Sequence, residues 1–310
     1  IKYYHHLKNK YEVIATTRPE TIFGDSAVAY HPSDTRYKGM HINLIVPLIN
    51  RKVPMVMDRF VKPEFGTGLV KLTPAHDKND FEAGKRTNVM VYRVIDDNGC
   101  IYNTGTYLDG MDRFEARKAV IKDLQELNLI EKIEDHTHKV GHCYRCDSII
   151  EPNLSNQWFV KMKPLAEKAM KMVTENKVTF HPEHHKKIFF HWLKNTNDWC
   201  ISRQIWWGHK IPIYTCNKCK NIICEENAPE KCIKCLSNDI SQSKDVLDTW
   251  FSSWLWPFSV FTKEEAEYYL PTSVLITGGD ILFFWVARMM MATGEFTNKI
   301  PFKDVYLHGI

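Results

Sequence analysis

Hydrophobic residues in the first third of the chain come in short runs, and Gly, Pro and Asp punctuate the intervals between them. The runs at 11–17, 43–47 and 66–73 have the length and composition of β-strands, and the last begins with a Gly-Thr-Gly turn. The pattern predicts a β-rich module over residues 1 to about 110.

A helical period replaces the strand pattern at Asp112. This residue and Glu115, three positions later, form a capping pair, and Asn128 stands at the expected end of the helix. The apolar positions that we expect this helix to bury are Phe114, Val120, Ile121, Leu124 and Leu127.

The character of the chain changes again near residue 135, where a module boundary is expected between 135 and 140. Histidine and cysteine clusters, a Lys-rich stretch at 161–194 and most of the tryptophans follow that point. The Lys-rich stretch is either a solvated helix face or a surface for RNA phosphates. The sequence thus predicts a β-rich module followed by a region of different construction.

Composition fits a soluble globular protein of two domains. The 310 residues are 44% apolar and 25% charged, and the net charge of +4 permits a nucleic-acid partner without requiring one. The apolar run at 281–287 ends at Arg288, well short of the ~20 residues that a membrane span needs. The chain begins with Ile1 rather than Met, so we expect an internal piece of a longer protein.

Six of the nine cysteines form three Cys-x-x-Cys pairs, which fits a reducing compartment, cytoplasmic or organellar, with metal sites. Twelve residues separate the pair Cys216 and Cys219 from the pair Cys232 and Cys235. Thiolates at this spacing can converge on one Zn²⁺, and the alternative is four free buried thiols. Cys224 lies between the pairs and is expected to be a spare thiol.

The third pair, Cys143 and Cys146, is half of a metal site. Its missing ligands are either His136, His138 or His142, or a second cysteine pair that precedes Ile1 in the parent. The alternative is a plain turn with two buried thiols.

Four stretches carry a family resemblance. They are 16–25 with Thr-Thr-Arg-Pro-Glu-Thr and Phe-Gly-Asp, 66–86 (GTGLVKLTPAHDKNDFEAGKR), 198–212 (DWCISRQIWWGHKIP) and 245–259 (DVLDTWFSSWLWPFS). Together they resemble the class I aminoacyl-tRNA synthetases for valine, isoleucine and leucine. The strings KLTPAHD at 71–77, WWGH at 206–209 and FFWVARMMM at 283–291 resemble the valine-specific enzymes most.

The resemblance implies a mixed α/β and β-rich fold in three parts. These are a β-barrel-like editing domain at 1–138, a connective stem with zinc-binding cysteines at 139–245, and part of a Rossmann-like aminoacylation domain at 246–310. The family's His-Ile-Gly-His and KMSKS motifs are absent. We therefore expect this chain to be unable to aminoacylate, with ATP and Mg²⁺ used only by the intact parent.

The implied activity is hydrolytic editing of threonyl-tRNA(Val). A hydrophobic pocket rejects an isostere that adds a hydroxyl only weakly, and valine-specific synthetases facing threonine are the standard example. By resemblance, Asp80 pairs with the substrate α-ammonium, and Lys71, Thr73 and Asp77 surround its hydroxyl. The other editing residues that the resemblance implies are Arg18, as part of the catalytic set, and Thr16 and Thr17, as a wall beside the terminal adenosine.

Simpler roles are open for the same residues. Asp77 and Asp80 take the N-cap and N3 positions of a short helix expected at 78–86, so both can be caps. Lys71 can be an exposed strand residue, and Arg18 can be a surface partner of Glu20.

The last part of the chain resembles a valine pocket. The resemblance places Trp250, Ile281 and Trp285 around the valine side chain, and Gly278 and Asp280 beside the adenylate ribose. Positions 281 and 285 also stand i, i+4 on an apolar helix face, which favours a core role. Asp280 can likewise be an N-cap.

The leading hypothesis is therefore an editing esterase that acts, as a monomer, on the acceptor end of tRNA(Val). The alternatives are a zinc-ribbon RNA-binding module and an editing domain of the isoleucyl or leucyl type. A free-standing deacylase would leave the Trp-rich region unexplained.

Overall fold

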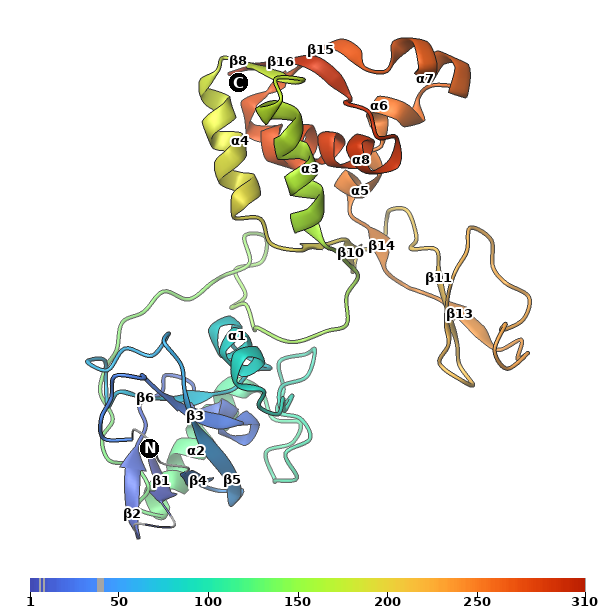
Figure 1. Ribbon diagram of the computed structural model, residues 1–310. Coiled ribbons are helices and arrows are strands. Elements are labelled where there is room, and N and C mark those ends of the chain that lie inside the picture. The colour runs from blue at the N-terminus through green and yellow to red at the C-terminus, as the bar shows by residue number, and fades with distance from the viewer. Residues whose placement is uncertain (6, 8, 38–41, 310) are drawn as a thin grey trace. The chain divides into compact units, whose positions relative to one another are not determined.

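The computed structural model describes the chain except for residues 6, 8, 38–41 and 310. It divides into two compact units, Ile1–Ser155 and Asn156–Ile310 (Figure 1). The division into parts at 1–138, 139–245 and 246–310 stays a prediction.

A curled, six-stranded half-barrel sheet forms the first unit. Its strand order is β2-β1-β4-β5-β3-β6, and all neighbours are antiparallel except β3 and β5. The strands are β1 (Lys2–His5), β2 (Lys10–Val13), β3 (Ala27–Tyr30), β4 (Asn43–Val46), β5 (Arg51–Met57) and β6 (Leu69–Leu72). The runs predicted at 11–17, 43–47 and 66–73 correspond to β2, β4 and β6, each with a shorter hydrogen-bonded core.

Three helices complete this unit, namely η1 (Pro19–Gly24), α1 (Lys78–Thr87) and α2 (Arg113–Glu126). Asp112 caps α2 by accepting from Phe114 N at 2.8 Å, as predicted, but the Glu115 side chain pairs with Lys118 instead of closing a capping box. Val120 and Leu124 are buried against the sheet core, whereas Phe114 and Ile121 are half-buried. The prediction that Leu127 is buried is wrong: the helix ends at Glu126, and the side chain of Leu127 is 57% exposed.

A three-stranded parallel sheet of order β15-β16-β8 organises the second unit. The strands are β8 (Thr179–His181), β15 (Thr272–Gly278) and β16 (Phe302–His308). Helices α3 (Met162–Thr174), α4 (His184–Lys194) and α8 (Arg288–Phe296) pack with this sheet around one apolar core. The short elements around them are β7 (Phe159–Val160), β9 (Trp199–Cys200), β10 (Ser202–Arg203), β14 (Val246–Leu247), α5 (Thr249–Ser253), α6 (Trp256–Ser259), α7 (Lys263–Tyr269), η2 (Gly279–Ile281) and η3 (Leu282–Ala287).

A small antiparallel ribbon of order β12-β11-β13 carries the four-cysteine motif of the second unit. Its strands are β11 (Ile213–Cys216), β12 (Ile222–Cys224) and β13 (Ile240–Gln242). Few of its apolar side chains are buried, Tyr214 and Ile223 being two that are. So small a core cannot stabilise the ribbon alone.

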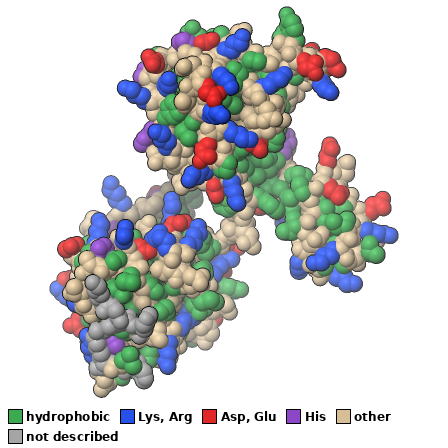
Figure 2. All heavy atoms as spheres, in the orientation of Figure 1, with side chains coloured by type: hydrophobic (Ala, Val, Ile, Leu, Met, Phe, Trp, Pro, Cys, Tyr) green, Lys and Arg blue, Asp and Glu red, His purple; other side chains and the backbone are tan. Residues whose placement is uncertain are grey.

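Charges of both signs are interspersed on one face of the molecule (Figure 2). On the face drawn in Figure 2, Lys and Arg side chains alternate with Asp and Glu side chains. No helix in the described part of the chain is both long enough and apolar enough to cross a membrane.

Candidate functional site

The Thr-Thr-Arg-Pro-Glu-Thr segment folds as the 3₁₀-helix η1 and its lead-in. Pro19 stands at the first helical position, where its missing N–H costs nothing. At the other end, a Cβ on Gly24 would lie 2.8 Å from Thr73 Cγ2, so only glycine lets η1 approach β6 this closely. The helix therefore places the next residue, Asp25, under the end of β6.

Asp25 is fully buried and collects three side chains. It accepts from Lys71 Nζ at 2.7 Å, from Thr73 Oγ1 at 2.9 Å and from the Tyr3 hydroxyl. Lys71 Nζ also donates to Thr21 Oγ1 at 2.8 Å and to Thr73 Oγ1 at 2.5 Å. An ammonium has three hydrogens, so the described contacts use every donor of Lys71. Lys71 is 6% exposed, so it is not the exposed strand residue that the simpler reading required.

Both threonine hydroxyls in this cluster already donate their hydrogens within the protein. Thr73 Oγ1 donates to Asp25, and Thr21 Oγ1 donates to Arg18 O at 3.0 Å. A hydroxyl oxygen has two acceptor sites, and Lys71 occupies one on each. By this count each hydroxyl oxygen keeps one unused acceptor site and no unused hydrogen, in side chains that are each 2% exposed.

Asp80 lies beside this cluster and binds its backbone. Its Oδ2 accepts from Thr73 N at 2.8 Å, and no hydrogen bond to Oδ1 is present within the described residues. The side chain is 8% exposed. Burial raises the pKa of Asp80 to about 7, which the Thr73 N–H opposes and the charge of Asp77 reinforces.

The two aspartates of α1 thus have different roles. Asp77 is the N-cap, since its Oδ1 accepts from Asn79 N at 2.7 Å and from Asp80 N at 3.0 Å. Asp80 makes no cap contact and points to Thr73. The capping hypothesis is correct for Asp77 and wrong for Asp80.

Arg18 is held by three acceptors. Its guanidinium donates to Glu20 Oε1 at 3.2 Å, to His76 O at 2.9 Å and to Glu151 Oε1 at 2.6 Å. The expected Arg18–Glu20 pair therefore exists, although Glu20 is fully buried rather than at the surface. Nearby, Thr16 Oγ1 accepts from Arg18 N, and Thr17 is exposed.

Sequence reasoning missed Asp25, Thr21 and Glu151. A signal existed for the first, because a lysine in the buried strand Leu-Val-Lys-Leu needs a buried carboxylate as partner. Nothing local identifies Glu151, which comes 133 positions after Arg18.

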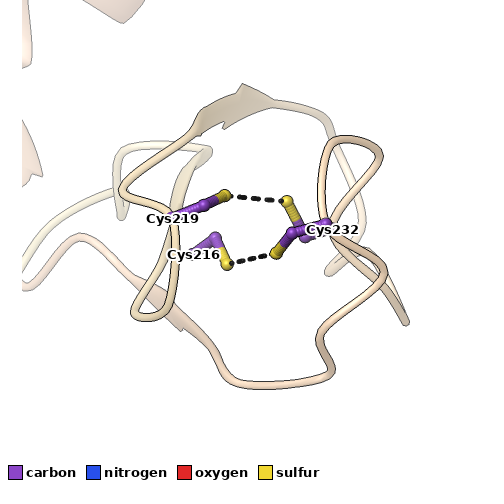
Figure 3. Close-up of side chains that lie close together, drawn as sticks. Cys216, Cys219 and Cys232 are labelled. Atoms are coloured by element: carbon purple, nitrogen blue, oxygen red, sulfur yellow. Dashed lines mark hydrogen bonds between the residues drawn. The ribbon is translucent and has the colours of Figure 1, made fainter.

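The four cysteines of the ribbon converge. Their Sγ atoms all lie within 4.8 Å of one another, with Cys216 and Cys235 at 3.5 Å and Cys219 and Cys232 at 3.6 Å. Figure 3 shows the labelled thiols turned toward each other from two loops. Four thiols at these separations fit tetrahedral coordination of a metal ion. Cys224 is exposed and lies outside the cluster, as expected of a spare thiol.

Both loops of the cluster are the same turn. Cys216 N donates to Asn221 O at 2.9 Å, and Lys220 N donates to Cys216 O at 2.8 Å. Cys232 repeats both bonds at 2.9 and 2.8 Å with Ser237 and Leu236. The fifth residue of each turn has positive φ, 59° in one and 58° in the other.

The third Cys-x-x-Cys pair adopts this turn as well. Cys143 N donates to Ser148 O at 2.9 Å, Asp147 N donates to Cys143 O at 2.8 Å, and φ of Asp147 is 57°. Within the described residues no third metal ligand joins this pair. His142 Nδ1 lies 2.8 Å from Asp147 O, while the rings of His136 and His138 stack on each other.

The residues expected around valine and ribose come from neighbouring elements of the second unit, since η3 contacts both α5 and η2. Gly278 ends β15, and the exposed Asp280 follows it, at the carboxyl edge of a parallel sheet where such folds bind ligands. Asp280 makes no cap bond, so the N-cap alternative is wrong.

The aromatic members of that set are half-buried. The Trp250 ring stacks on Phe284 at 5.9 Å, and Trp285 Nε1 donates to Ser253 O at 3.2 Å. Ile281 ends a 3₁₀ turn and Trp285 lies in a π-helical turn, so the two are not on one regular α-helix.

Comparison with known proteins places this arrangement in a family. Residues 8–310 match the family described as tRNA synthetases class I (I, L, M and V). A valine–tRNA ligase of Carboxydothermus hydrogenoformans is 53% identical over 305 residues, covering 97% of this chain and 35% of that protein. A valine–tRNA ligase of Thermotoga maritima is 51% identical with the same coverage.

A solved ternary complex of Agrobacterium radiobacter K84 LeuRS with tRNA and LeuAMS matches with a TM-score of 0.34 and 17% identity, over 100% of this chain and 39% of that one. The chain spans about a third of the length of the curated valine–tRNA ligases it matches. By its family match over nearly all residues, the chain belongs to the class I tRNA synthetases of the isoleucine, leucine, methionine and valine group.

Proposed function

We propose that the first unit hydrolyses mischarged threonyl-tRNA(Val), as an editing site of a valine–tRNA ligase. The observation that carries the proposal is the convergence of Thr73, Lys71 and Asp80 beside η1, with hydroxyl oxygens left as acceptors. The relatives named valine–tRNA ligase supply the context, since such an enzyme must remove threonine from its tRNA.

Recognition of threonine follows from the hydrogen-bond accounting. The substrate hydroxyl donates its hydrogen to the open acceptor site of Thr73 Oγ1 or Thr21 Oγ1. Valine has no such hydrogen and would cover these polar groups without pairing them, which is unfavourable. Lys71 acts by fixing both hydroxyls, not by donating to the substrate itself.

Asp80 is suited to the α-ammonium of the esterified amino acid. Its Oδ1 is open to a ligand, and an adjacent ammonium would favour the charged carboxylate against the cost of burial. Arg18 belongs to the catalytic set, Asp77 holds α1 and one flank of the site, and Thr16 and Thr17 line the approach of the terminal adenosine.

A deacylation assay with threonyl-tRNA and valyl-tRNA, run side by side, tests this function. We expect Asp80→Ala to slow threonyl-tRNA hydrolysis about ten- to a hundred-fold, since it removes a charge-assisted bond of roughly 1.5–3 kcal/mol. Thr73→Val should instead weaken the preference for threonine over valine. Unchanged hydrolysis by folded Asp80→Ala protein would end the assignment.

We further propose that Cys216, Cys219, Cys232 and Cys235 bind Zn²⁺. The sulfur geometry supports this, as does a ribbon whose apolar core is too small to fold unaided. Burial acts to raise the pKa of Cys232, but the N–H groups of Lys234 and Cys235 lower it, whereas the neighbouring thiols raise the pKa of Cys235. A bound divalent cation would favour the thiolate form of all four.

The turn shared by all three Cys-x-x-Cys pairs extends the zinc proposal to Cys143 and Cys146, as two ligands of a second site. The missing ligands are either the neighbouring histidines or a cysteine pair elsewhere in a longer parent. In that parent, the set Trp250, Gly278, Asp280, Ile281 and Trp285 would serve valine activation with ATP and Mg²⁺, and the acceptor end of tRNA(Val) would be the shared partner.

The competing function is a zinc-ribbon RNA-binding module with the half-barrel as scaffold. It predicts that Asp80→Ala changes nothing but stability. The deacylation assay therefore separates the two functions with one variant.

A further inference from the structure

Arg18 is immobilised by its surroundings to an unusual degree for a side chain that is 26% exposed. A guanidinium has five N–H donors in a fixed fork. Nε, Nη1 and Nη2 each donate one hydrogen bond, to Glu20, the His76 carbonyl and Glu151 respectively. Two N–H groups remain for a ligand. The direction in which they point depends on which of the three acceptors constrains the guanidinium most strongly.

The Glu20 carboxylate has a second cationic partner and does not need Arg18 to compensate its charge. Arg117 grips Glu20 with two bonds of 2.8 Å, from Nε to Oε2 and from Nη2 to Oε1. Burial acts to raise the pKa of Glu20, but the bonds and charge of Arg117, followed by the charge of Arg18, hold that pKa below its usual value. At 3.2 Å the Arg18 contact with Glu20 is the longest of the three.

Glu151 makes the shortest contact with Arg18, at 2.6 Å between Nη2 and Oε1. Its side chain is only 14% exposed, so water weakens the ion pair little. The other carboxylate oxygen, Oε2, lies 3.2 Å from Arg113 Nε on α2. Glu151 therefore sits between two fixed arginines, and of the three acceptors it constrains the Arg18 fork most strongly.

The segment that carries Glu151 is held against the rest of the first unit by further contacts. Ile149 O accepts from Arg113 Nη2 at 3.2 Å, and Asn153 Nδ2 donates to Ile95 O at 3.4 Å. Pro152 O lies 3.3 Å from His76 Nδ1. These contacts use backbone carbonyls rather than the Glu151 carboxylate, so they hold the segment beside the half-barrel in addition to the ion pairs of Glu151.

His76 does not compete for Glu151. Burial lowers the pKa of His76 to about 4, so its ring is neutral near pH 7. Val94 N donates to its Nε2 at 2.9 Å, which leaves the hydrogen on Nδ1, facing Pro152 O. The 4.0 Å approach of Nδ1 to Glu151 is thus no ion pair, and the carboxylate serves the arginines alone.

We propose that Glu151 is a positioning residue of the editing site, which fixes the Arg18 guanidinium so that its two remaining donors face the bound substrate. The inference rests on the proposed editing function. It assigns a role to residues 149–153, which form no helix or strand. This segment follows the half-barrel strands at a distance in the sequence but belongs to the same compact unit.

Glu151→Gln tests this in the 310-residue chain with threonyl-tRNA as the probe. Because Glu151 acts only through Arg18, the variant should lower kcat/KM about ten- to a hundred-fold, as a misplaced catalytic group does. The double variant with Arg18→Ala should then be no slower than Arg18→Ala alone. A merely structural Glu151 predicts effects that multiply, which would overturn the proposal.

Glu131→Gln is the matched control, since it removes a glutamate that also follows α2 but pairs with Lys2. It should leave the rate unchanged. The NMR signal of the Arg18 Nε–H supplies a readout besides activity: sharp and slowly exchanging in the wild type, broadened in Glu151→Gln. If the wild type and Glu151→Gln gave equal NMR signals and equal rates, the positioning role of Glu151 would be overturned while the editing function stood. If the wild type were inactive although the NMR signal changed as expected, the editing function and the role built on it would both be overturned.

Discussion

Asp80 combines a buried carboxylate with a pKa near the working pH. Burial raises that pKa to about 7, so near neutrality the free protein holds Asp80 partly protonated. The ammonium of the substrate needs the ionised form. We therefore predict that kcat/KM for threonyl-tRNA, corrected for spontaneous hydrolysis, rises tenfold per pH unit below about 7 and levels off above it. A flat profile between pH 5.5 and 8 would contradict this role.

The same residue gives a stability prediction of opposite sense. A carboxyl whose pKa is higher in the folded than in the unfolded protein binds more protons when folded, so it destabilises the fold as pH rises from about 4 to 7. Asp80→Asn keeps an acceptor for Thr73 N and removes the charge. We expect this variant to be more stable than the wild type by on the order of 1–4 kcal/mol at pH 8, and equal to it at pH 4. Denaturant titrations at the two values measure it, with the exposed Asp97→Asn as control.

At this scale the sequence indicated which residues lie together but not all of their partners, and the roles of these residues in hydrolysis stay predictions. Lys71, Thr73 and Asp80 do gather, as the family resemblance implied. Asp25, which binds both Lys71 and Thr73, was not foreseen, because it lies 46 positions before Lys71 and the antiparallel pairing of β3 with β6 brings the two together. Long-range pairing of that kind leaves no local pattern.

At the scale of elements, the Cys-x-x-Cys turns are the most regular feature of the chain. Each leaves its fifth residue at positive φ and has the same two backbone hydrogen bonds around its first cysteine. We predict that Cys216→Ser lowers bound zinc by about one ion per chain and unfolds the β11–β13 ribbon, because metal binding supplies its folding energy. Cys224→Ser, an exposed cysteine of the same ribbon, should change neither. Metal analysis and ribbon amide signals report both effects, and full zinc in Cys216→Ser would refute the site.

Helix boundaries show where pattern reasoning stops. The cap of α2 at Asp112 was predictable because it is a local hydrogen bond, whereas the burial of Leu127 was not, because the turn at Asn128, with φ of 57°, ends the helix first. At 281–287 the apolar period suggested one α-helix, and a 3₁₀ turn followed by a π turn occurs instead. Periodicity reports which faces are apolar but not how each turn is hydrogen-bonded.

At the scale of the whole molecule, the position where the residue types change does not coincide with the boundary between the two compact units. The residue types shift near 135, yet the first compact unit extends to Ser155. The segment in between has no helix or strand and few buried apolar groups, so it looks like a linker in sequence. Polar contacts to Arg18, His76 and Arg113 nevertheless attach its end to the half-barrel.

Two truncations decide which boundary the protein uses. Residues 1–155 should fold cooperatively and hydrolyse threonyl-tRNA, because this range contains the whole half-barrel together with the segment 149–153 that carries Glu151. Residues 1–138 lack Glu151, so Arg18 loses the shortest of its three contacts and the partly buried Arg113 loses its ion pair. We expect the shorter piece to be less stable by about 1–3 kcal/mol and slower in hydrolysis.

Glu151→Gln in the longer piece should reproduce most of the loss in rate but less of the loss in stability, since the backbone contacts of Ile149 and Pro152 remain. Equal melting temperatures and equal rates for the two pieces would show that the boundary near 138 is the physical one.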